Sequence, residues 1–98
     1  MGQSLRSANF LIESRLRDAA KGRVNAYYEL GIAYSSGSGG VGIDLIEAHK
    51  WFNLAAVNGV GRAQQCRAEI AEEMTAREIA EAQKAARAWL GGMERRAA

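Results

Sequence analysis

Hydrophobic residues recur at steps of three and four along most of the chain, the spacing that places them on one face of an α-helix. The first stretch shows this in Leu5, Ala8, Ile12, Leu16 and Ala19, and predicts a helix from about Ser4 to Lys21. The chain has no sustained alternation of polar and apolar residues and no proline. The pattern therefore favours an all-α protein.

Capping and breaking residues divide the rest of the chain into four more helices. Gly22 is expected to end the first helix and Asn25 to cap the second, which carries Ala26, Tyr27, Leu30, Ala33 and Tyr34. Gly31 lies inside that second helix, which suggests that a neighbouring helix approaches closely. The segment 35–43 is glycine-rich and is expected to be a flexible connector, since it lacks the Gly-Lys-Ser/Thr sequence of a phosphate-binding loop.

Asp44, with Glu47 three residues later, predicts the start of the third helix. Its expected buried face is Leu45, Ala48, Phe52, Ala55 and Ala56, with Trp51 flanking it, and Asn58-Gly59 ends it. The fourth helix should span about 61–74. Thr75 and Glu78 form a capping box for the fifth, whose inner face is Ile79, Ala82, Ala86 and Trp89. Gly91-Gly92 is expected to stop this helix and to leave 93–98 as a frayed tail.

Five helices with short connections predict stacked antiparallel hairpins in a single domain over residues 1–92. The length of 98 residues allows one domain at most. The formal net charge of +2 is too small to indicate nucleic acid, and no apolar run is long enough for a membrane span or a secretory signal. A single cysteine, Cys66, fits a reducing compartment, so we expect a cytoplasmic protein.

Faint self-similarity suggests a helical repeat. Gly22 and Ala26 recur as Gly59 and Ala63, 37 residues further along the chain. Between them lies a denser pattern: Ala26, Leu30-Gly31, Tyr34, a Gly-rich turn, Asp44, Ala48, Trp51-Phe52, Ala55-Ala56 and Gly59. This pattern resembles the Sel-one-like repeat, a relative of the tetratricopeptide repeat, and we expect a protein of a bacterial kind.

The resemblance covers residues 26–62 as one complete repeat, and residues 61–90 look like a degenerate capping hairpin in which Arg67-Ala68 replaces Leu-Gly. It implies a tetratricopeptide-like α–α superhelix and a non-catalytic adaptor that presents a concave helical surface to a partner protein or peptide. By the family's geometry, Asn25, Tyr28 and Ile32 face that groove on the second helix. The equivalent positions on the fourth helix are Arg62, Gln65 and Glu69, and these six residues are the candidate partner-binding site.

Catalytic chemistry finds little support in the sequence. His49 and Cys66 are the only histidine and cysteine, and neither has a companion at metal-ligand spacing. His49 is expected to be exposed to solvent. Glu69, Glu72 and Glu73 are typical of an ordinary solvated helix face. We therefore expect no catalytic residues, no metal and no cofactor.

Two alternatives to an adaptor remain open. Leu11, Ile32 and Leu54 have no obvious intramolecular cover, which suggests a self-associating module, a homodimer. A small nucleic-acid-binding regulator would use Arg6, Arg15, Arg17 and Arg23, although a basic first helix is more often a solvated face.

Overall fold

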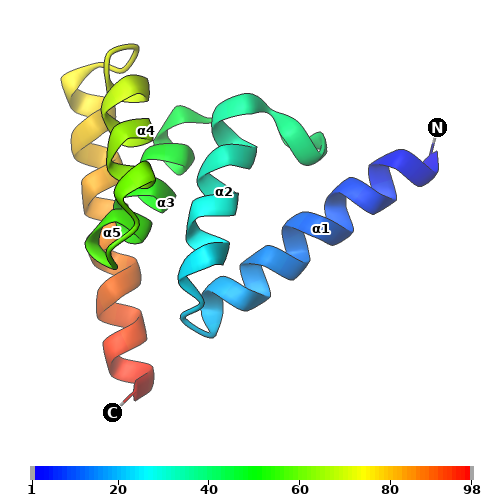
Figure 1. Cartoon of the computed structure of the whole chain (residues 1–98), viewed down its shortest axis with the longest axis horizontal. Coiled ribbons are helices and arrows are strands. Elements are labelled where there is room, and N and C mark those ends of the chain that lie inside the picture. Colours follow the sequence, from blue (N-terminus) through cyan, green and yellow to red (C-terminus); the bar gives the residue numbers. More distant parts are fainter. Residues whose placement is uncertain (1, 98) are drawn as a thin grey trace.

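The computed structural model describes the backbone of residues 2–97 and the side chains of residues 10–38 and 40–96. Over this range the chain is all-helical, as the sequence predicts, and contains no strand (Figure 1). The elements are α1 (Gly2–Ala20), α2 (Val24–Ser36), the short 3-10 helix η1 (Ser38–Gly40), α3 (Leu45–Val57), α4 (Gly61–Ala71) and α5 (Ala76–Ala97).

The turns after α1 and after α3 have the same hydrogen-bonded geometry. Gly22 and Gly59 both adopt a left-handed conformation, with φ of 80° and 94°, which glycine reaches without steric cost. The next amide donates to the carbonyl five residues earlier in each turn: Arg23 to Asp18 and Val60 to Ala55, both at 3.1 Å. The spacing of 37 residues seen in the sequence is therefore a repeat of one helix-ending turn.

Side-chain caps define the starts of α3 and α5. The Asp44 carboxylate accepts a hydrogen bond from the Glu47 amide at 3.1 Å, and Thr75 and Glu78 exchange both bonds of a capping box. The predicted cap of α2 is wrong. That helix begins at Val24 after the extended residue Arg23, which makes no side-chain cap bond, so Asn25 lies inside the first turn.

Two predicted helix ends also differ. Helix α4 ends at Ala71 rather than near Met74, whose amide instead bonds the Ala71 carbonyl in the turn that follows. Helix α5 continues through Gly91-Gly92 to Ala97, so the described part of the expected tail, residues 93–97, is helical. A glycine in the middle of a helix lowers its stability by about 1 kcal/mol relative to alanine, which is too little to end a helix of this length by itself.

The core is centred on α3. Its largest fully buried side chains are Trp51, Phe52, Leu30 and Leu54. Trp51 is therefore a central core residue rather than a flanking one, and Leu54, expected to lack cover, is also buried. Three helices, α2, α4 and α5, pack around α3 and leave it little free surface.

Gly31 makes the predicted close approach between α2 and α3. A Cβ atom at this position would lie 2.5 Å from Cδ1 of the Phe52 ring. Only glycine lets the α2 backbone rest on that ring, so the helix carries a residue of low helix propensity for a packing reason.

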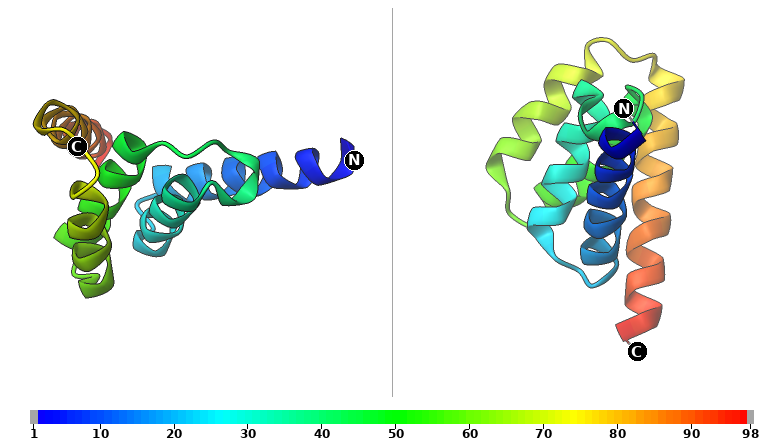
Figure 2. Two further views of the ribbon diagram at one scale, coloured as in Figure 1. Left: turned by 90° about the horizontal axis from the view of Figure 1, so that it is seen from above. Right: turned by 90° about the vertical axis from the view of Figure 1, so that its right-hand side faces the viewer.

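The first helix leaves the body of the molecule at an angle. It packs on α2 and η1, and its N-terminal end points away from the other helices (Figure 1). Figure 2 shows α2 and α4 on one side of the molecule and α5 on the other, with the C-terminal end of α1 beside α5. The side chains of Phe10 and Leu11 on α1 are 62% and 47% exposed.

We predict that Gly31→Ala and Gly92→Ala change stability in opposite directions. Overpacking against Phe52 should lower the free energy of unfolding of the first variant by about 1 kcal/mol or more, even after the gain in helix propensity. A Cβ at Gly92 would meet no described atom within 4 Å beyond its chain neighbours and the nearby α5 backbone, so the second variant should gain up to about 1 kcal/mol. Urea unfolding of both variants checks this, and a stabilised Gly31→Ala protein would contradict the packing described here.

Candidate partner-binding site

The six candidate residues lie on α2 and α4 as predicted, but the structure does not gather them into one cleft. On α2, Tyr28 and Ile32 line a groove against α1, whereas Asn25 lines a separate cleft. On α4, the other three are exposed and line none of the clefts described below: Arg62, Gln65 and Glu69.

The groove between α1 and α2, here called the α1–α2 groove, is the more apolar of these two clefts. It has a volume of about 230 Å³ and is lined mainly by Leu11, Ile12, Tyr28, Ile32 and Ala33. Leu11 of α1 and Ile32 of α2 both line the groove and are 47% and 38% exposed. Two large apolar side chains therefore remain accessible at a concave surface.

A salt bridge closes one side of the α1–α2 groove. Nε of Arg15 donates to Oε2 of Glu29 at 2.7 Å, joining α1 to α2. Both side chains are partly exposed, so this pair contributes little to stability. Its main effect is on how the two helices are positioned. Sequence reasoning missed Leu11, Ile12 and Arg15 as site residues, because the angle between α1 and α2 is a tertiary feature.

Tyr28 is not the exposed anchor that the sequence suggests. It is half-buried, and its ring packs on Phe52 with a centroid separation of 5.9 Å and a tilt of 55°. The same contact holds Tyr28 at the floor of the groove. Ile32, one helical turn later, is the exposed member of the pair.

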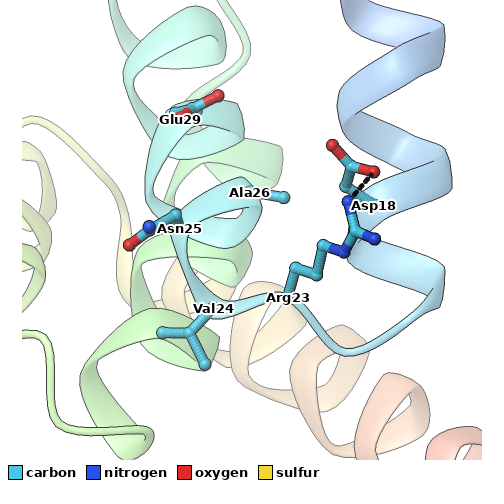
Figure 3. A pocket seen from close by; sticks show the side chains of 6 residues that line it. All are labelled: Asp18, Arg23, Val24, Asn25, Ala26 and Glu29. Atoms are coloured by element: carbon cyan, nitrogen blue, oxygen red, sulfur yellow. Dashed lines mark hydrogen bonds and ion pairs between the residues drawn. The ribbon is translucent and has the colours of Figure 1, made fainter.

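The second cleft is polar and contains Asn25. It has a volume of about 300 Å³ and also includes Asp18, Arg23 and Glu29 (Figure 3). Nη1 of Arg23 donates to Oδ1 of Asp18 at 3.0 Å, while the Asn25 side chain points away from this ion pair. Arg15 and Arg23, both named above for nucleic acid, are thus already paired with carboxylates.

His49 contradicts the expectation of solvent exposure. Only 3% of the residue is accessible, because α2, α4 and α5 cover α3 on several sides. Its Nδ1 atom is buried and has no hydrogen-bond partner among the described residues. Burial, and secondly the positive charge of Arg67, hold the pKa of His49 below its usual value, so the ring is neutral at pH 7.

Among the described residues, Tyr34 also has a displaced pKa. Burial raises the pKa of its phenol, and the carboxylates of Glu47 and Asp44 raise it further. The described side chains form no cluster of three or more His, Cys, Asp or Glu residues that could hold a metal ion. Cys66 is a free, half-buried thiol.

Comparisons with known proteins give no match: no family model, no curated protein and no solved structure matches this chain. None of the described helices combines the length and the apolar character that crossing a membrane requires.

We predict that acid weakens the fold through His49. Because its pKa is lower in the folded state, the unfolded chain takes up the proton first as pH falls below about 6.5. Stability should be constant above about pH 7.5 and should decline as the pH falls toward about 5.5, before most carboxylates titrate. Thermal melting across this range should give a flatter profile for His49→Leu, and parallel profiles for the two proteins would refute the assignment.

Proposed function

We propose that this protein is a non-catalytic interaction module that binds a segment of a partner protein in the α1–α2 groove. The observation that carries the proposal is that Leu11 and Ile32, both exposed, line one groove together with the half-buried Tyr28. Apolar side chains that remain accessible in a concave surface with a polar border are typical of protein interfaces.

The groove supplies three kinds of contact. Leu11 and Ile32 offer apolar area, and Tyr28 offers a rigid aromatic surface fixed by Phe52. The Arg15–Glu29 pair provides one charge of each sign at the border, where polar partner groups can be oriented. Binding would then depend mainly on the apolar pair, because exposed ion pairs contribute little.

We further propose that residues 26–62 are a Sel-one-like repeat. The paired turns at Gly22 and Gly59, the Gly31–Phe52 contact and the burial of Ala26, Ala48, Ala55 and Ala63 support this. In an array of such repeats, α1 would correspond to the second helix of a preceding unit and α4–α5 to the closing pair.

To test the groove, we would replace Leu11 and Ile32 together with glutamine, which retains helix propensity. Surface changes usually alter stability by less than about 0.5 kcal/mol, so the variant should fold normally. Affinity capture from the source cell should recover a partner with the wild type and lose it with the double variant. Val57→Gln is the matched control, since Val57 is 61% exposed but lies outside the groove. An identical set of captured proteins for all three chains would place the binding surface elsewhere.

Self-association is the second candidate function, and the exposure of Phe10 beside Leu11 favours it. The two side chains are neighbours near the middle of α1, and both are exposed. Two copies could cover these side chains by pairing their projecting helices about a two-fold axis.

We expect a homodimer at micromolar or higher concentration, and Phe10→Glu should dissociate it by placing a charge in the apolar contact. Ile43→Glu is the control, because Ile43 is equally exposed at 67% but lies in the connector before α3. Sedimentation velocity measures the association. A strict monomer over the whole concentration range would eliminate this candidate.

A further inference from the structure

The C-terminal halves of α1 and α5 approach each other on the side of the molecule away from α4 (Figure 2). Residues of both helices line a third cleft there. We call it the α1–α5 cleft. It has a volume of about 420 Å³, and its walls are Leu16 and Ala20 from α1 and Ala88, Trp89, Gly92 and Met93 from α5. Arg96 closes one end, where its Nη1 donates to the Ala20 carbonyl at 3.3 Å.

Gly92 points to an occupant from outside the chain. A glycine inside a helix lowers its stability by about 1 kcal/mol relative to alanine, and a close contact is one reason for a helix to carry it. Gly31 has such a contact with Phe52, but a Cβ at Gly92 would meet no described atom within 4 Å apart from its chain neighbours and the nearby α5 backbone. Because Gly92 lines the cleft, its missing side chain leaves the α5 backbone open to a group that enters the cleft.

The charged residues near the cleft indicate the charge of the group that enters it. The last turn of α1 contains Arg17, Lys21 follows it, and the last turn of α5 contains Arg95 and Arg96. None of these four residues forms an ion pair among the described side chains.

The nearby acidic residues do not cancel this charge. Asp18 is bound to Arg23. Glu94 lies two residues from Gly92 and therefore on another face of α5. Glu13 lies about one turn before Arg17 on α1, toward the N-terminal end of that helix. The cleft is therefore apolar inside and basic at the end where the two helices finish.

We propose that the α1–α5 cleft binds an acidic amphipathic helix of a partner protein. Small residues at Ala20, Ala88 and Gly92 let a third helix approach two others closely, as ridges pack into grooves. Large apolar side chains of that helix contact Leu16, Trp89 and Met93, and its carboxylates pair with the arginines at the border. This surface is separate from the α1–α2 groove and extends the proposed function to a second partner segment.

Calorimetric titration of the full chain with synthetic peptides tests the proposal. The probe is a peptide of about 12 residues, long enough to span the cleft at 1.5 Å per residue, with leucines on one face and glutamates beside them. A second peptide carries lysine in place of every glutamate. The glutamate peptide should bind saturably in the micromolar range and weaken with salt, and the lysine peptide should bind at least about tenfold more weakly.

Gly92→Leu is the decisive variant, because it fills the cleft at a position that contacts nothing else. The variant should melt no lower than the wild type. It should bind the glutamate peptide at least about tenfold more weakly. Gly61→Leu is the matched control, since Gly61 is also helical with open space around it but lies on α4, and it should bind normally. Arg17→Glu should weaken binding, whereas Arg77→Glu at the other end of α5 should not.

Three results would overturn the proposal: no saturable binding of the glutamate peptide, equal binding of the lysine peptide, or equal binding by Gly92→Leu and Gly61→Leu. The Leu11→Gln, Ile32→Gln double variant should bind the glutamate peptide with the affinity of the wild type. If it loses the peptide while Gly92→Leu retains it, the peptide occupies the α1–α2 groove, and only the inference about the α1–α5 cleft fails.

Discussion

The indole ring of Trp51 holds α2, α3 and α5 together, and the remainder of the fold depends on that contact. The ring stacks on Tyr27 of α2 at 5.8 Å between centroids and meets Trp89 of α5 edge-on at 4.9 Å. Its Nε1 donates to Glu47 at 2.9 Å, and the Lys50 ammonium lies 4.4 Å from the ring centroid. The one polar atom of the indole is therefore satisfied, which allows the ring to be buried without the cost of an unpaired donor.

Both proposed binding surfaces depend on this aromatic cluster. Trp89 belongs to the cluster and also lines the α1–α5 cleft, so the position of α5 sets the shape of the cleft. The α1–α2 groove depends on the neighbouring residue Phe52, which touches Gly31 and Tyr28 and fixes the groove-facing side of α2. Trp51 and Phe52 are consecutive, and their side chains contact different residues of α2, so one turn of α3 supports both surfaces.

Local sequence signals predicted most of the fold, because they act within one helix or turn. The caps at Asp44 and Thr75 and the glycines at Gly22 and Gly59 needed no tertiary information. The burial of His49, Trp51 and Leu54 was missed or understated, since it depends on three helices surrounding α3. The candidate site was predicted in part. Ile32 is exposed in a groove, but the groove's other wall, on α1, follows from an inter-helix angle that no residue pattern specifies.

A double-mutant cycle on Trp51 and Trp89 tests most directly whether the aromatic cluster joins the helices. Urea unfolding would give the stability of Trp51→Leu, of Trp89→Leu and of the protein that carries both changes. Edge-to-face aromatic pairs contribute about 0.5–1.5 kcal/mol beyond their buried area, so the double variant should lose less stability than the two single losses combined, by an amount in that range. Losses that add within about 0.3 kcal/mol would show that the two rings act independently and would contradict the account.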